Sequence, residues 1–210
     1  MTTLLWARHG ENVANLSRTL SHRMFDGELT QAGRRQAAEL AARLGDSAGE
    51  PVSYIVCSPL RRARQTAEII AHRLGQPVAA ELEDLRELDV GDLDGRNDGL
   101  AWDTYRGVLA AWRAGRPDAR FPGGENRTEL CARLVRALTA VSVPAAGARP
   151  LIVAHGGALR AALPALADQP DPGADLATGS FATLAVSRSD GSLRVELLSW
   201  PGQRQRYEAR

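Results

Sequence analysis

Residues 4–10 read LLWARHG, an apolar run that stops at an arginine, a histidine and a glycine. The apolar part, Leu4 to Ala7, predicts a buried β-strand, and the change at Arg8 predicts its end. Residues 151–157, LIVAHGG, repeat this order of apolar run, histidine and glycine. We therefore expect two buried strands, far apart in the chain, that each end in a histidine.

Between these two strands the apolar pattern alternates between helix and strand. Thr30 is typical of the N-cap of a helix that Gly45 ends, and residues 53–57 predict a second strand. A helix follows, with Pro59 in its first turn and Gly75 after its last. The other elements that we expect are a short strand near Val78, helices over about 99–114 and 126–141, and a helix after Gly157 that is interrupted or bent near Pro164.

The chain closes with two β-patterned runs joined by Asp190-Gly191, a pair typical of a hairpin turn. Alternating strands and helices predict an α/β fold, a three-layer α/β/α sandwich with a mainly parallel sheet and a late antiparallel edge strand. The length suits one compact domain over residues 1–210, with no internal repeat or low-complexity linker. The terminal hairpin offers an edge for a homodimer.

The composition is that of a globular protein and excludes several classes of function. The chain is 44% hydrophobic with a formal net charge of +1, so neither nucleic acid nor a membrane is an expected partner. All 26 basic residues are arginine, and a chain without lysine has no Walker A lysine and no Schiff base. Cys57 and Cys131 are isolated, which argues against a disulfide framework or a zinc site. With no signal-peptide or transmembrane run, we expect a cytoplasmic protein.

His9 and His155 are the residues most suggestive of chemistry. Ligands of open α/β sheets bind beyond the carboxyl ends of the strands, so two histidines at such ends can converge on one ligand. The alternative is that each histidine fills a strand-end turn. The glycines that follow allow close approach of the backbone, and Arg8 adds a fixed positive charge. This combination favours a phosphate pocket over a metal site, for which no ligand pattern is present.

A third strand end supplies arginines and a later acidic segment supplies a carboxyl group. The arginines are Arg61, Arg62 and Arg64. Side chains of neighbouring residues on a helix point in different directions, so we expect most of these arginines to be solvated. Glu87 lies between Leu85 and Leu88, where partial burial would favour the protonated acid. It is therefore the expected proton donor.

Together these residues resemble a known family. The motifs occur in the family's order: Arg8-His9-Gly10-Glu11, Leu29-Thr30 with Gly33 and Gln36-Ala37, Ser58 through Arg62-Ala63 to Gln65-Thr66-Ala67, Glu87 with Gly91 and Gly95, Phe121-Pro122-Gly123-Gly124-Glu125, and His155-Gly156-Gly157 with Arg160. The chain resembles the histidine phosphatase superfamily, in the branch that includes the cofactor-dependent phosphoglycerate mutases. The resemblance covers residues 4 to about 160 and implies a phosphoglycerate mutase-like fold.

The resemblance also implies a role for each matching residue. His9 would be the nucleophile that becomes transiently phosphorylated, while Arg8, Arg62 and His155 would surround the phosphoryl oxygens. Glu87 would protonate the leaving oxygen and then take a proton from the attacking water. The phosphate would also contact Asn15 and the N–H group of Gly156. No metal and no other cofactor is expected.

Departures from the mutase pattern favour hydrolysis. Asn12 stands where the family has threonine or serine, a change at the edge of the pocket. Val90 and Gly157 replace a tyrosine and an asparagine of the mutases, and the mutase lysine and paired-arginine insertion are absent. We expect a phosphomonoesterase for a small phosphorylated metabolite. The alternatives are a phosphoglycerate mutase and a non-catalytic module that binds a phosphorylated ligand.

A helical, lid-like insertion is expected over about 96–125. It carries four aromatic residues and five arginines: Trp102, Tyr105, Trp112 and Phe121, with Arg96, Arg106, Arg113, Arg116 and Arg120. These side chains suit a sugar, a nucleotide or another phosphorylated metabolite. The aromatic residues equally suit a helix that packs on the core.

Overall fold

The computed structural model describes residues 1–46, 50–142, 147–189 and 192–202, and six strands of this part form one sheet. The spatial order of the strands is β3-β2-β4-β1-β5-β6. Their bounds are β1 Thr2–Arg8, β2 Ile55–Cys57, β3 Val78–Glu81, β4 Leu151–Ala154, β5 Phe181–Ser189 and β6 Ser192–Ser199. Strands β1 to β4 pair in parallel, whereas β5 pairs antiparallel with β1 and with β6. The predicted α/β architecture is confirmed.

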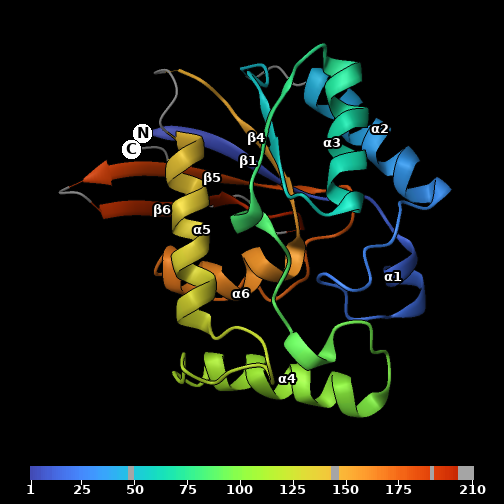
Figure 1. Cartoon of the computed structure of the whole chain (residues 1–210). Helices are drawn as coiled ribbons and strands as arrows, with labels where there is room; N and C mark the ends of the chain where they lie inside the picture. The colour runs from blue at the N-terminus through green and yellow to red at the C-terminus, as the bar shows by residue number, and fades with distance from the viewer. Residues whose placement is uncertain (47–49, 143–146, 190–191, 203–210) are drawn as a thin grey trace.

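Helices cover both faces of this sheet (Figure 1). Helices α2 (Gln31–Gly45) and α3 (Arg61–Leu74) pack on one face. Helices α5 (Arg127–Ser142) and α6 (Gly156–Leu166) pack on the other, and α4 (Gly99–Arg113) lies beyond α6, away from the strands. Shorter elements are α1 (Val13–Ser17) and two 3₁₀ turns, η1 (Glu83–Leu85) and η2 (Gly91–Leu93).

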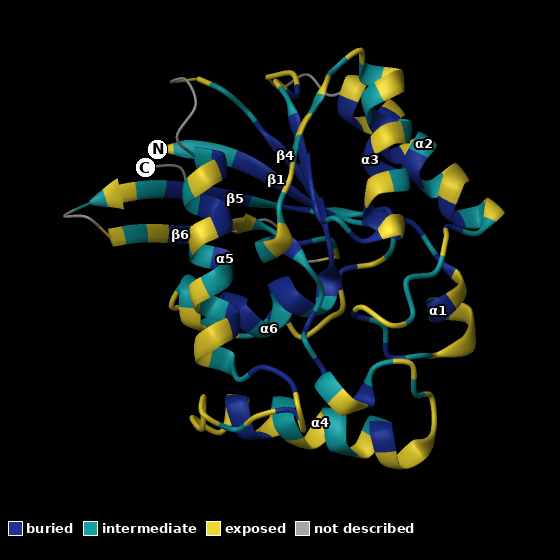
Figure 2. Cartoon of the chain, viewed as in Figure 1, coloured by how far each residue is buried: buried dark blue, intermediate teal, exposed yellow. Residues whose placement is uncertain are grey.

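The alternation of side chains along β1 divides the core into two layers. Leu5 and Ala7 point into the layer beneath α2 and α3, and Leu4 and Trp6 point into the layer beneath α5 and α6. All four are fully buried, which explains why this strand reads as a continuous apolar run. In Figure 2 the inner strands are dark blue and the outer faces of the helices carry the yellow, exposed residues.

Parallel pairing places three strand ends side by side. Arg8 of β1 is aligned with Ala154 of β4, and Cys57 of β2 is aligned with Val153 of β4. The residues that follow these strands therefore leave the sheet at one edge. The side chain of Trp6 strengthens this arrangement, because its indole N–H donates to the carbonyl of His155 over 3.1 Å.

Several local predictions need correction. Pro59 lies outside α3, whose N-cap is Leu60, so it is not in the first helical turn. Helix α6 continues through Pro164 to Leu166 and is not interrupted there, because a proline removes only one backbone N–H donor; a bend at Pro164 stays a prediction. Gly75 ends α3 with a left-handed φ of 64°, as expected. The hairpin pair Asp190-Gly191 lies outside the described residues, and the short helix α1 was not predicted.

Strand β6 is the outermost strand on its side of the sheet. Pairing of this edge in a homodimer stays a prediction. No helix in the described ranges is long and apolar enough to cross a membrane. A cytoplasmic location also stays a prediction.

Candidate active site

His9 lies directly after β1 and is 3% exposed. Two hydrogen bonds define the orientation of its ring. Its Nδ1 atom is 2.7 Å from the carbonyl oxygen of Gly10, and its Nε2 atom is 3.2 Å from Nε of Arg62. A guanidinium only donates, so Nε2 accepts and the proton of the neutral ring is on Nδ1. The lone pair of Nε2 is therefore directed at the guanidinium of Arg62.

His155 lies against His9, as expected from the matching strand ends. The two ring centroids are 5.2 Å apart at an interplanar angle of 60°. Nε2 of His155 is 2.8 Å from the hydroxyl oxygen of Ser58, which follows the third aligned strand. Nδ1 of His155 is buried and has no hydrogen-bond partner in the described part of the chain. This ring therefore has one nitrogen bonded to Ser58 and one that is buried without a partner in the described part of the chain.

Two arginines give the site its positive charge. Arg62 is 2% exposed and donates from Nη1 and Nη2 to the hydroxyl and carbonyl oxygens of Ser21. Arg8 donates from Nη1 to the carbonyl of Leu176 over 2.7 Å, while its buried Nε has no partner among the described residues. Both guanidinium groups line the pocket described below.

Burial and these charges hold the two histidines in the neutral state. The pKa of His9 lies well below its ordinary value because of burial first, and then because of the charges of Arg62 and Arg8. The pKa of His155 is lowered in the same direction by burial, by Arg62 and by His9. Near neutral pH His9 therefore keeps the Nε2 lone pair that a nucleophile needs.

Glu87 reaches the same site from another part of the chain. Its Oε1 accepts the N–H of Ala158 over 2.6 Å, and Oε2 accepts that of Gly157 over 3.3 Å. The N–H of Leu88 also donates to Oε1. The carboxyl group thus lies at the first turn of α6. Glu87 is part-buried, as expected, and the structure adds three backbone N–H donors to its carboxyl oxygens.

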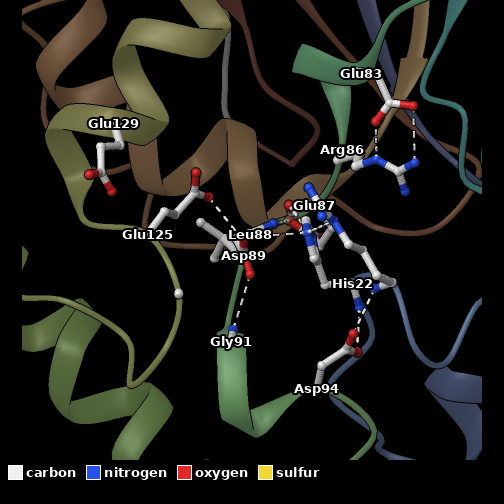
Figure 3. A network of polar contacts seen from close by, with 12 residues as sticks. His22, Glu83, Arg86, Glu87, Leu88, Asp89, Gly91, Asp94, Glu125 and Glu129 are labelled. Atoms are coloured by element: carbon white, nitrogen blue, oxygen red, sulfur yellow. Dashed lines mark hydrogen bonds and ion pairs between the residues drawn. The ribbon is translucent and has the colours of Figure 1, made fainter.

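A polar network holds the segment that carries Glu87 (Figure 3). His22 donates from Nδ1 to the carbonyl of Glu87, and Arg133 donates to the same carbonyl. Arg133 also pairs with Glu125 over 2.7 Å. The carboxylate of Asp94 accepts the N–H groups of residues 22, 23 and 24, which fixes the backbone around His22. Burial lowers the pKa of His22, which favours its neutral ring.

Asn15 and Gly156 are close to the site, with part of their polar groups already engaged. Asn15 and Asn12 form a reciprocal capping box at the start of α1, in which each backbone N–H donates to the other side chain over 3.1 Å. Asn12 is fully buried and takes the N-cap, a position that suits asparagine as well as serine or threonine. Both Asn15 and Gly156 line the pocket, and their contact with phosphate stays a prediction.

These groups open into a pocket of about 820 Å³. The pocket is lined on its outer side by α4, including Trp102, Tyr105 and Arg113. Phe121 is fully buried and stacks on Tyr105 with ring centroids 5.5 Å apart. Some aromatic residues of this segment therefore pack in the core, and others line the pocket. Of the five arginines expected on the lid, two line the pocket, Arg106 and Arg113.

The residues that sequence reasoning missed lie mainly in this network and at the pocket mouth. His22, Arg133, Asp94 and Asp171 carry no local signal, although Glu125 belongs to the PGGE motif. No group of three or more histidine, cysteine, aspartate or glutamate side chains in the described ranges is arranged to hold a metal ion.

The family model of the histidine phosphatase superfamily (branch 1) matches residues 4–200. The chain belongs to this superfamily. A Klebsiella pneumoniae (strain 342) protein named "Probable phosphoglycerate mutase GpmB" is 40% identical over 162 residues, 76% of this chain and 72% of that relative. Phosphoglycerate mutase-like protein 4 of Arabidopsis thaliana is 36% identical over 154 residues, 73% of this chain and 66% of that protein.

Solved structures of the superfamily have the same fold. The mycobacterial glucosyl-3-phosphoglycerate phosphatase in complex with VO3 superposes with a TM-score of 0.77 at 29% identity, over 95% of this chain and 99% of that one. In this histidine phosphatase the expected residues His9, Arg8, Arg62, Glu87 and His155 lie together at one sheet edge, which is what the motif order implied.

Proposed function

We propose that this histidine phosphatase is a metal-independent phosphomonoesterase that hydrolyses a small phosphorylated metabolite through a phosphohistidine on His9. The observation that carries the proposal is the orientation of His9. Its Nδ1 proton is bonded to Gly10, so Nε2 carries the lone pair. This lone pair accepts a hydrogen bond from Nε of Arg62, and it can attack phosphorus once Arg62 donates to the phosphoryl oxygens instead. A neutral imidazole held in this way is a competent nucleophile toward phosphorus.

In the first step Nε2 of His9 attacks phosphorus and the bond from phosphorus to the ester oxygen breaks. The leaving oxygen takes the bonding pair and receives a proton from Glu87, which takes part in its protonated form. In the second step a water oxygen attacks phosphorus and gives a proton to Glu87. The P–N bond breaks, and its electron pair returns to Nε2.

Charge stabilisation in both steps comes from the side chains. Arg8 and Arg62 face the developing charge on the phosphoryl oxygens, and we assign the unpartnered ring nitrogen of His155 as a further contact. Asn15 and the N–H of Gly156 are assigned to the same phosphoryl group. Preorganised positive charge in a buried site supplies what phosphoryl transfer chiefly needs.

The segment 96–125 is assigned as a lid in the same proposal. Helix α4 closes the outer side of the pocket with Trp102, Tyr105 and Arg106, away from the strand ends. Substrate selection would therefore depend on α4, whereas the chemistry depends on the sheet edge.

A second candidate is interconversion of phosphoglycerates. It is favoured by the names of the curated relatives. Against it stand Val90 and Gly157, which replace the tyrosine and asparagine of the mutases. Mutase activity predicts stimulation by 2,3-bisphosphoglycerate and transfer of phosphate between the 2- and 3-positions without release. Hydrolysis predicts stoichiometric release of phosphate.

The test is release of p-nitrophenol from p-nitrophenyl phosphate in excess EDTA. His9→Ala should lower kcat/KM by at least about a thousandfold, because the covalent route is lost. His72→Ala, a change of an exposed histidine on α3, is the control and should retain activity. Quenched wild-type reactions should contain an acid-labile phosphoryl group on His9. Full activity of His9→Ala would refute the proposed nucleophile, and phosphate binding without turnover would favour a non-catalytic module.

A further inference from the structure

The arginines that line the pocket differ in whether a carboxylate neutralises them. The structure describes six: Arg8, Arg62, Arg106, Arg113, Arg127 and Arg160. Four of them have a carboxylate within 4 Å. Arg62 pairs with Asp26, Arg106 with Asp103, and both Arg113 and Arg160 with Asp171. Arg8 and Arg127 have no such partner in the described part of the chain.

The same two arginines share a second feature. The Nε atoms of Arg8 and Arg127 are buried and have no hydrogen-bond partner among the described residues. An unsatisfied buried donor costs about 1–3 kcal/mol, so such atoms in a native structure call for an explanation. Arg8 is next to His9, and the phosphoryl group of the proposed reaction accounts for its free charge. Nothing in the proposed chemistry accounts for Arg127.

Arg127 lines the pocket beside the end of α4. It is the first residue of α5, and its Nη1 donates to the carbonyl of Trp112 at the end of α4 over 3.1 Å. Asn126 and Glu129 cap the same helix turn reciprocally, which holds the backbone at this point. With Nη1 engaged, Nε and Nη2 remain as a pair of parallel donors. This pair matches the two oxygens of a carboxylate or of a phosphate.

We propose that Arg127 binds a second anionic group on the substrate, at the end remote from the scissile phosphate. The inference rests on the proposed function and narrows it to phosphomonoesters whose leaving group carries a carboxylate or a second phosphate. Two uncompensated arginines in one pocket correspond to two anionic groups of one ligand. Because Nε is buried, the side chain would have to turn toward the ligand for Nε to donate to it.

The test compares substrates that differ only in the second anion. Glycerol 3-phosphate and 3-phosphoglycerate differ by a hydroxymethyl group in place of a carboxylate. Fructose 6-phosphate and fructose 1,6-bisphosphate differ by the second phosphate. A preference for 3-phosphoglycerate would identify the group that Arg127 binds as a carboxylate. A preference for fructose 1,6-bisphosphate would identify it as a phosphate. Wild-type protein should prefer the charged member of at least one pair by about tenfold or more in kcat/KM.

Arg127→Gln should remove this preference, with a loss of about ten- to hundredfold for the charged member and less than about twofold for its neutral counterpart. Arg127→Lys, which keeps the charge and loses the paired donors, should recover part of it. Arg136→Gln is the matched control, because Arg136 is on the same helix, exposed and paired with Asp84 outside the pocket. Equal losses for both members of a pair, or a lowered melting temperature that explains them, would refute the role of Arg127.

Binding to His9→Ala protein, measured by calorimetry, separates this inference from the proposed function. The charged members should bind more tightly than their neutral counterparts, and the additional change Arg127→Gln should abolish the difference. If wild-type protein hydrolyses p-nitrophenyl phosphate through His9 but shows no charge preference in turnover or binding, the inference fails and the proposed function stands. If hydrolysis through His9 is absent and the binding preference depends on Arg127, the proposed function fails and the second anion site stands.

Discussion

At the inner end of the pocket His9 and Arg62 are 2–3% exposed, and His155 behind His9 is fully buried. At the outer end Trp102 and Tyr105 are part-exposed and Arg106 is exposed. His9 and His155 directly follow buried strands, so sheet pairing fixes their positions, and Arg62 is in the first turn of α3. The outer groups are side chains of one amphipathic helix, and their contacts depend on how α4 packs. The residues proposed for the chemistry therefore lie on the sheet, and the residues proposed for substrate selection lie on α4, where substitutions disturb the sheet less.

The largest expected effect concerns Glu87 at the inner end. Glu87→Gln should lower kcat for an alkyl ester such as glycerol 3-phosphate by about 10²–10⁴-fold, because an alkoxide needs a proton to leave. The effect on p-nitrophenyl phosphate should be much smaller, since p-nitrophenolate is a weak base. Steady-state kinetics on both substrates measure the ratio. Equal losses on the two esters would show that Glu87 supports the fold of the site and does not transfer a proton.

Phe121 tests how far the outer end depends on packing. It is fully buried, stacks on Tyr105 and contacts Trp112 with ring centroids 5.4 Å apart. Phe121→Ala should lower the free energy of unfolding by about 3–5 kcal/mol in urea denaturation. Trp102→Ala, at a part-exposed position, should cost clearly less and act mainly on KM. A similar loss of stability in both variants would contradict the division between packing and lining aromatics.

The two buried histidines predict a pH dependence of stability. Their pKa values in the folded chain lie well below the ordinary 6.5. Below pH 6.5 the unfolded chain therefore binds protons that the folded chain does not, and stability falls as the pH falls. The slope reaches at most about 1.4 kcal/mol per pH unit for each histidine. Urea denaturation between pH 7.5 and 5 should give a shallower slope for His155→Gln than for His72→Gln, and identical slopes would contradict this assignment.

The smallest expected effect concerns Gly157, which lies against the carboxyl group of Glu87. A Cβ atom at this position would lie 2.9 Å and 3.0 Å from the two carboxylate oxygens of Glu87. Because these atoms end a side chain, Gly157→Ala should displace the carboxyl group without unfolding the protein and lower kcat for glycerol 3-phosphate by roughly tenfold. Gly107→Ala in α4, where a Cβ meets nothing within 4 Å, should leave kcat unchanged and add about 0.5–1 kcal/mol of stability. Unchanged kcat in Gly157→Ala would show that the carboxyl group adapts to the methyl group.

Sequence reasoning placed His9 and His155 because their signals are local, whereas the roles of Arg62 and Asn15 were implied by the resemblance to the family. A buried strand is visible as an apolar run, its end is visible as the first polar residue, and parallel pairing brings such ends together. It misplaced Pro59 by a residue or two, where the choice between first turn and cap depends on details of backbone geometry. It predicted the partial burial of Glu87 but not its backbone partners, because nothing near residue 87 indicates that the start of α6 lies against it.

The sequence by itself determined the sheet, the two strand-end histidines and the arginine-rich chemistry around them, since each follows from residues adjacent in the chain. Only the tertiary structure decided which arginines are neutralised and which are free. The pairs of Arg113 and Arg160 with Asp171, and the contact of Arg133 with Glu87, join positions up to 58 residues apart without any periodic pattern. Charge compensation depends on distances of a few ångströms between side chains from different elements, and such distances exist only once the chain has folded.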